Sequence, residues 1–119
     1  MRSETEAVVR VSIRSQARQP LSVEAVVDTG FDGFLSMPPS TIGSLALVQI
    51  AEVFAELANG EEAPTRVFEA EAEWDGRAVP IEVAEFDCEP LLGMRLLAGY
   101  HLGIDVTNGG RVEIRLLRR

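Results

Sequence analysis

The sequence lacks lysine altogether and has only one cysteine and one histidine. Its eleven basic residues are therefore all arginines. Cys88 and His101 together cannot form an internal disulfide or a tetrahedral zinc site, since each would need more ligands or a second thiol. We therefore expect a protein that works without a metal or any other cofactor.

Positive charge and long apolar runs are also scarce. Eleven basic residues face 19 acidic ones, which gives a net charge of −8, and the sequence pI is about 4.6. Such a chain lacks the positive field that binding to a nucleic-acid backbone needs. No apolar run approaches the ~18 residues that span a bilayer, and the opening residues lack the order of a secretory signal. A length of 119 residues leaves room for one core. We expect one soluble domain over residues 1–119, located in the cytoplasm, with neither nucleic acid nor membrane as partner.

The apolar residues that are present recur mostly with period two, which is typical of half-buried strands. This pattern predicts strands over residues 7–14, 21–27, 68–74, 79–83 and 112–116. Asp75-Gly76 and Asn108-Gly109-Gly110 are turn sequences of the kind that joins hairpins. Short helices are predicted over 40–45, after two prolines, and over 94–100. Because strands do not alternate with long helices, the fold class is mostly β rather than a doubly wound parallel sheet.

The segment with most chemical content is Asp28-Thr29-Gly30, which directly follows an apolar strand. A carboxylate near the core is costly unless hydrogen bonds or a neighbouring group compensate. A glycine in the turn allows another backbone to approach closely. Taken alone, the tripeptide is explained as well by an Asx turn that closes the strand.

A second motif downstream changes this balance. Leu91-Leu92-Gly93 ends an apolar strand and leads into a short helical segment that begins Met94-Arg95-Leu96-Leu97. The first motif reads Val27-Asp28-Thr29-Gly30-Phe31, then Gly33-Phe34-Leu35. In this order the two motifs resemble those of the retropepsin-like (clan AA) aspartic proteases, and more narrowly their small prokaryotic single-domain members. The resemblance covers residues 23–104.

This resemblance implies a closed retropepsin-like acid-protease β-barrel with one or two short helices, which acts as a homodimer on a peptide or protein substrate. Asp28 would be the catalytic carboxyl, and Thr29 and Gly30 would support its loop. Residues 57–62 lie where the family has its flap hairpin, and Asn59-Gly60 suits the tip of a hairpin. The expected substrate contacts are Phe31, Asp32, Asn59, Gly60 and Leu92.

The chemistry agrees with a dimer. Cleavage of an amide by carboxyls alone requires one ionised group as base and one protonated group as acid. A single Asp28 cannot be both, whereas two copies related by a twofold axis would bring two carboxyls together. Carboxyls this close share one proton and titrate as a pair, which is the known behaviour of aspartic-protease dyads. The sequence thus predicts an aspartic endopeptidase.

Two other functions are compatible with the sequence. Phe31 is much larger than the Ala or Ser found there in viral relatives, and Met94 replaces their arginine. A dimer of this fold that binds peptides with little or no turnover is therefore an alternative, as is an ordinary β domain in which Asp28 is a turn residue. A thiol nucleophile is disfavoured, because Asp87 and Glu89 are expected to raise the pKa of the Cys88 thiol.

Overall fold

The computed structural model describes residues 1–15, 19–56 and 59–117. In these residues the chain forms nine strands and two short helices, which confirms the mostly β prediction. In chain order they are β1 (Val8–Arg14), β2 (Leu21–Val27), β3 (Leu35–Met37), α1 (Pro39–Leu45), β4 (Val48–Glu56), β5 (Glu62–Trp74), β6 (Arg77–Glu85), β7 (Leu91–Leu92), α2 (Met94–Leu97), β8 (Tyr100–Ile104) and β9 (Val112–Leu116).

Seven of the strands form one sheet in the order β1-β2-β7-β3-β6-β5-β4, and β1 also pairs with β5. The pairings of all these strands except β4 therefore run round a closed circuit. Its interior holds most of the apolar core, in which Ile13, Leu35 and Leu92 have no exposed surface. The apolar residues of the alternating sequence pattern thus face the inside of this circuit, and the polar residues between them face the outside.

The short strand β7 has a special place, because it lies between β2 and β3. Val27 pairs with Leu92 in parallel, and Leu35 pairs with Leu92 in the antiparallel sense. The ends of β2, β3 and β7 therefore meet at one place, and Asp28 leaves β2 there.

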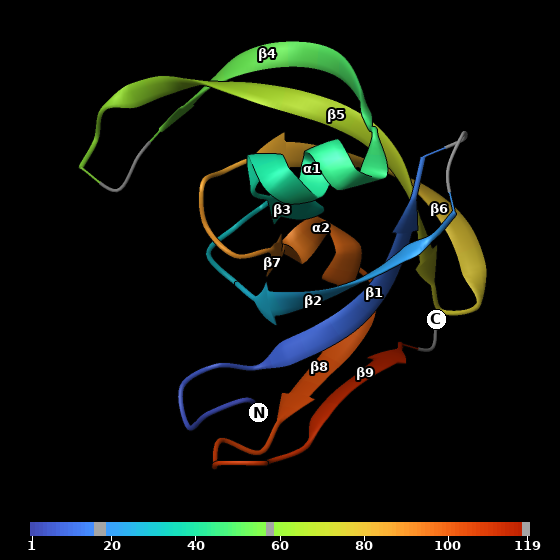
Figure 1. Ribbon diagram of the computed structural model, residues 1–119. Helices are drawn as coiled ribbons and strands as arrows, with labels where there is room; N and C mark the ends of the chain where they lie inside the picture. The colour runs from blue at the N-terminus through green and yellow to red at the C-terminus, as the bar shows by residue number, and fades with distance from the viewer. Residues whose placement is uncertain (16–18, 57–58, 118–119) are drawn as a thin grey trace.

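Strands β4 and β5 form a long hairpin that arches over α1 (Figure 1). Eight of the nine residues of β4 are exposed, so this strand does not belong to the core. Glu56 pairs with Glu62 at the end of the hairpin, where Gly60 has a φ of 84° and the Asn59 side-chain oxygen accepts a hydrogen bond from the Glu61 N–H at 3.0 Å. The hairpin expected over 57–62 is thus present, although residues 57–58 lie outside the described part of the chain.

The turn between β5 and β6 is also as predicted. Asp75 and Gly76 have φ angles of 53° and 75°, as a tight hairpin turn of this sequence requires, and Trp74 pairs with Arg77 across it. Trp74 is half-buried and packs on the core, and its ring meets Tyr100 edge to face with centroids 5.9 Å apart.

The C-terminal region corrects one prediction. The helix expected over 94–100 ends at Leu97, because Gly99 has a φ of 87° and Tyr100 already begins strand β8. Strands β8 and β9 form a separate two-stranded sheet, from which Leu102 and Ile114 pack against the core. In the described part of the chain, no helix has the length and apolar character needed to cross a membrane.

Candidate active site

Backbone hydrogen bonds between neighbouring strands hold Asp28 in place. Its N–H donates to the carbonyl of Leu92 at 2.9 Å, just beyond the pairing of Val27 with Leu92. Two residues earlier on β2, the Val26 N–H donates to the carbonyl of Pro90 at 2.9 Å. The position of Asp28 is therefore set by β7 as much as by its own strand.

The Asp28 side chain also organises its own loop. Its Oδ1 accepts a hydrogen bond from the Gly30 N–H at 2.9 Å, and its carbonyl accepts one from the Phe31 N–H at 3.1 Å. Asp28 is half-buried, whereas Thr29, Gly30 and Asp32 are exposed. The carboxylate is thus oriented by an Asx turn and still reaches the surface of the single chain.

Gly93 is required by a close approach of two backbone segments. A Cβ atom on Gly93 would lie 2.2 Å from the Gly33 carbonyl oxygen and 2.8 Å from that of Phe31. This approach lets the Gly93 N–H donate to Phe34 at 2.9 Å and the Met94 N–H donate to Phe31 at 2.8 Å. The second motif therefore packs behind the first through main-chain contacts, which no side chain could replace.

Phe31 fills the space that two glycines leave open. A Cβ atom on either Gly33 or Gly93 would lie 2.6 Å from an atom of the Phe31 ring. The ring also meets Phe86 edge to face, with centroids 6.0 Å apart. The contacts of Phe31 in the single chain are therefore with its own loop, with Gly93 and with Phe86 of the β6–β7 connection. A contact with substrate stays a prediction.

Leu92 requires a correction. It was expected to touch substrate, but its side chain has no exposed surface and lies in the core. Its contribution to the site is the backbone carbonyl that holds Asp28.

The remaining predicted residues lie apart from the loop in sequence. Asn59 and Gly60 are exposed at the end of the β4–β5 hairpin, and Figure 1 shows this end projecting toward the same side as the connection from β2 to β3. Asp32 is exposed next to Phe31. Arg95 lies over the ring of Phe34, 5.6 Å from its centroid, and in the described part of the chain it forms no ion pair with Asp32.

Cys88 lies on the connection between β6 and β7, close enough to respond to the charge of Asp28. Cys88 is exposed, and partial loss of water around its thiol is the largest cause that raises its pKa above the usual value. The negative charges of Glu89, Asp87 and then Asp28 add to this rise in pKa. The thiol is therefore kept protonated, as expected from its acidic neighbours, and is a poor nucleophile at neutral pH.

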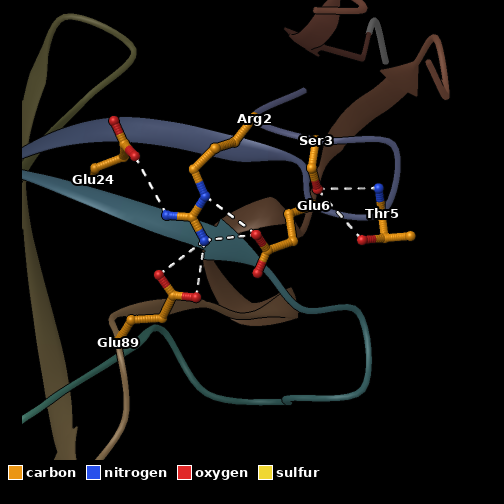
Figure 2. Close-up of polar contacts among 6 residues, drawn as sticks. All are labelled: Arg2, Ser3, Thr5, Glu6, Glu24 and Glu89. Carbon is orange, nitrogen blue, oxygen red and sulfur yellow. Dashed lines mark hydrogen bonds and ion pairs between the residues drawn. The ribbon is translucent and has the colours of Figure 1, made fainter. Parts of the chain in front are cut away.

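An ion-pair cluster that the sequence does not reveal borders this connection. The Arg2 guanidinium contacts both carboxylate oxygens of Glu89 at 2.9 Å and also bonds Glu6 at 2.9 Å, as Figure 2 shows. Glu24 of β2 lies at 3.5 Å from the same group. Hydrogen bonds to Glu6 and Glu89 raise the pKa of Arg2 above its usual value. Arg2 thus ties the N-terminal segment to β2 and to the β6–β7 connection.

The comparisons with known proteins agree with this arrangement. The EIAV protease, in its complex with the inhibitor HBY-793, matches with a TM-score of 0.56 at 20% sequence identity. The match covers 80% of this chain and 88% of the viral chain. This chain has a retropepsin-like fold. No protein-family model matches the sequence, and no curated protein does. At this identity the likeness establishes the fold, and the retropepsin-like arrangement expected from the two motifs is confirmed.

The Gly93 contact leads to a first prediction. Gly93→Ala should lower the free energy of unfolding by about 3 kcal/mol, because the new methyl group would overlap the Gly33 carbonyl. Gly43→Ala is the matched control, since a Cβ there meets nothing within 4 Å and the residue lies in α1. It should stabilise the protein by about 0.5–1 kcal/mol. Denaturant unfolding measures both, and equal effects would show that the close approach is absent.

A second prediction concerns Phe31. Phe31→Ala should destabilise the protein by about 2 kcal/mol, because it removes a half-buried ring from between Gly33, Gly93 and Phe86. Phe54→Ala is the control, since Phe54 is 73% exposed and should change stability by less than about 0.5 kcal/mol. Thermal unfolding distinguishes the two. A neutral Phe31→Ala would mean that the ring does not support the loop.

A third prediction follows from the raised pKa of Cys88. Alkylation by iodoacetamide, followed by mass spectrometry over pH 7 to 10, should show a higher midpoint in the folded protein than in guanidinium chloride. Asp28→Asn should lower that midpoint slightly, because it removes one of the charges that raise the pKa. Asp75→Asn, at the β5–β6 turn, should leave the midpoint unchanged. A folded midpoint below the unfolded one would contradict this electrostatic account.

Proposed function

We propose that the protein is an aspartic endopeptidase that acts as a homodimer, with one Asp28 carboxyl from each subunit. The observation that supports this most strongly is the half-buried Asp28 carboxylate, fixed by its loop and by Leu92 in a retropepsin-like fold. Each chain has one Asp-Thr-Gly sequence and therefore offers one such carboxyl.

The need for a second copy comes from the chemistry. Water is a weak nucleophile and an amide is a poor electrophile, so hydrolysis by carboxyls needs a base and an acid in one site. An isologous dimer provides both from the same residue, because the twofold axis places the two Asp28 loops opposite each other. Two carboxyls this close share a proton, so one is the base and the other the acid.

In this mechanism the ionised Asp28 removes a proton from a water molecule held between the two subunits. The water oxygen attacks the scissile carbonyl carbon, while the protonated Asp28 donates its proton toward the carbonyl oxygen. The resulting tetrahedral diol collapses as the leaving nitrogen takes a proton from the first carboxyl, and the second recovers its proton from the diol. Each cycle consumes one water and returns the shared proton to the pair.

The other residues of the loop would support this pair. Thr29 is exposed in the single chain, where its hydroxyl is available to link the two loops across the axis. Gly30 leaves room for a substrate backbone beside Asp28. Asp32 and the hairpin end at Asn59 and Gly60 are the proposed substrate contacts. In the C-terminal part of the chain, Leu116 and Met94 are 56% and 45% exposed, which leaves apolar surface for a second copy to cover.

The test compares wild type with Asp28→Asn in the cleavage of a peptide library between pH 3 and 7. Asp28→Asn should lower turnover by about 100-fold or more, because it removes both the base and the acid of the pair. The dimer should persist, as measured by size-exclusion chromatography with light scattering, because the substitution removes a repulsion. Asp75→Asn is the control and should cleave like wild type.

Three results would contradict the proposal, each in a different way. Equal cleavage by wild type and Asp28→Asn would place the catalytic group elsewhere. Saturable peptide binding without turnover in either would favour the peptide-binding module. A wild-type protein that stays monomeric would leave each Asp28 without its partner and would favour a turn role for it.

A further inference from the structure

A cavity of about 600 Å³ has part of its lining near the end of β2 that is opposite to Asp28. Arg14 and Ser15, which line it, follow Ile13, and Ile13 pairs with the first residue of β2, Leu21. Asp28 follows the last residue of the same strand, which at ~3.3 Å per residue lies about 20 Å away. The rest of the lining comes from the start of β4, from three neighbouring rungs of β5 and β6, and from Ala46 and Phe34. Phe34 is the last residue of the connection from β2 to β3 that begins with Asp28, so the cavity touches this connection at its far end. The cavity is within the size range of small-molecule sites.

Two carboxylates of like charge face each other across strands at this cavity. Glu69 of β5 pairs directly with Glu82 of β6, and both line the cavity. Like charges in this position destabilise a sheet unless something lies between them. The next glutamate along β5, Glu71, is neutralised by Arg14 at 2.6 Å. In the described part of the chain, neither Glu69 nor Glu82 has an arginine partner, so together they leave a net negative charge at the cavity.

The same cavity has an apolar part and a buried polar atom. Val48 and Ile50 line it and are 58% and 47% exposed, so they give the cavity an apolar wall that a ligand can cover. Ser15 also lines it and is only 8% exposed, yet its hydroxyl has no hydrogen-bond partner among the described residues. Buried hydroxyls are normally satisfied, so the wall of the cavity holds a polar group that lacks a partner. This observation is independent of the charge of the glutamates.

We propose that the cavity binds an organic cation with an apolar body, such as an aryl-alkyl amine. The ammonium group lies between Glu69 and Glu82, where it relieves their repulsion. The apolar body covers Val48 and Ile50. The cavity shares only Phe34 with the connection that begins with Asp28, and both carboxylates that hold the ammonium group lie on β5 and β6, so this binding does not depend on the proposed protease activity.

The test uses three probes of the same length and different charge: 4-phenylbutylamine, 4-phenylbutan-1-ol and 4-phenylbutyrate. Binding is followed by NMR titration of ¹⁵N-labelled full-length protein. The amine should bind, with shifts centred on the amides of Ala70 and Ile81 rather than on the Asp28 loop. The alcohol should bind about tenfold more weakly, and the acid should not bind. Charge selectivity in this order is the result expected of two unpaired carboxylates.

Conservative variants then assign the charge. Glu69→Gln and Glu82→Gln should each weaken amine binding about two- to fivefold and leave alcohol binding unchanged, since each removes one exposed ion pair. Glu73→Gln is the matched control, because it lies on the same strand and does not line this cavity. These substitutions leave the core intact, so folding is retained. Equal affinity for all three probes, shifts centred on Asp28, or loss of amine binding in Glu73→Gln alone would each overturn the proposal.

Discussion

The close contact between the backbones of Gly93 and Gly33 is the constraint on which the rest of the candidate site depends. Only a residue without a Cβ atom fits there, and the fit allows β7 to enter between β2 and β3. Because β7 is held there, the Leu92 carbonyl can fix Asp28 from behind, and the Phe31 ring has two glycines to pack on. The two sequence motifs are thus one structural unit, assembled from segments about sixty residues apart in the chain.

Electrostatics serves two purposes in this acidic chain. Arg2 joins the N-terminal segment to the β6–β7 connection, and Arg14 forms an ion pair with Glu71, its neighbour across the paired strands β1 and β5. Their planar guanidinium groups can bond several carboxylate oxygens at once, as Arg2 does, which suits a chain without lysine. Elsewhere in the described part of the chain, carboxylates lie next to each other with no arginine paired to them, as Glu69 and Glu82 do. Such places are where a positively charged ligand is expected to bind.

Much of the fold could be predicted from period-two alternation and turn sequences, because half-buried strands and tight turns leave local signatures. Strand β4 has no buried residue and therefore no alternation, so its hairpin was indicated by the family resemblance and by the turn at Asn59-Gly60. The end of α2 depended on the positive φ of Gly99, which a helix-forming composition does not reveal. The position of Asp28 was predictable from its motif. The buried state of Leu92, the packing of Phe31 on Gly93 and the ion pairs of Arg2 were not, since each depends on contacts between distant segments.

The central claim is that function resides in a pair of Asp28 carboxyls that meet across a twofold axis. A crystal structure of the protein bound to a statine-type inhibitor would test it most directly, because the inhibitor hydroxyl mimics the attacking water. The account predicts one inhibitor per two chains, with that hydroxyl within hydrogen-bond distance of both Asp28 carboxyls. A structure in which every Asp28 faces bulk solvent, with the inhibitor absent or bound elsewhere, would contradict it.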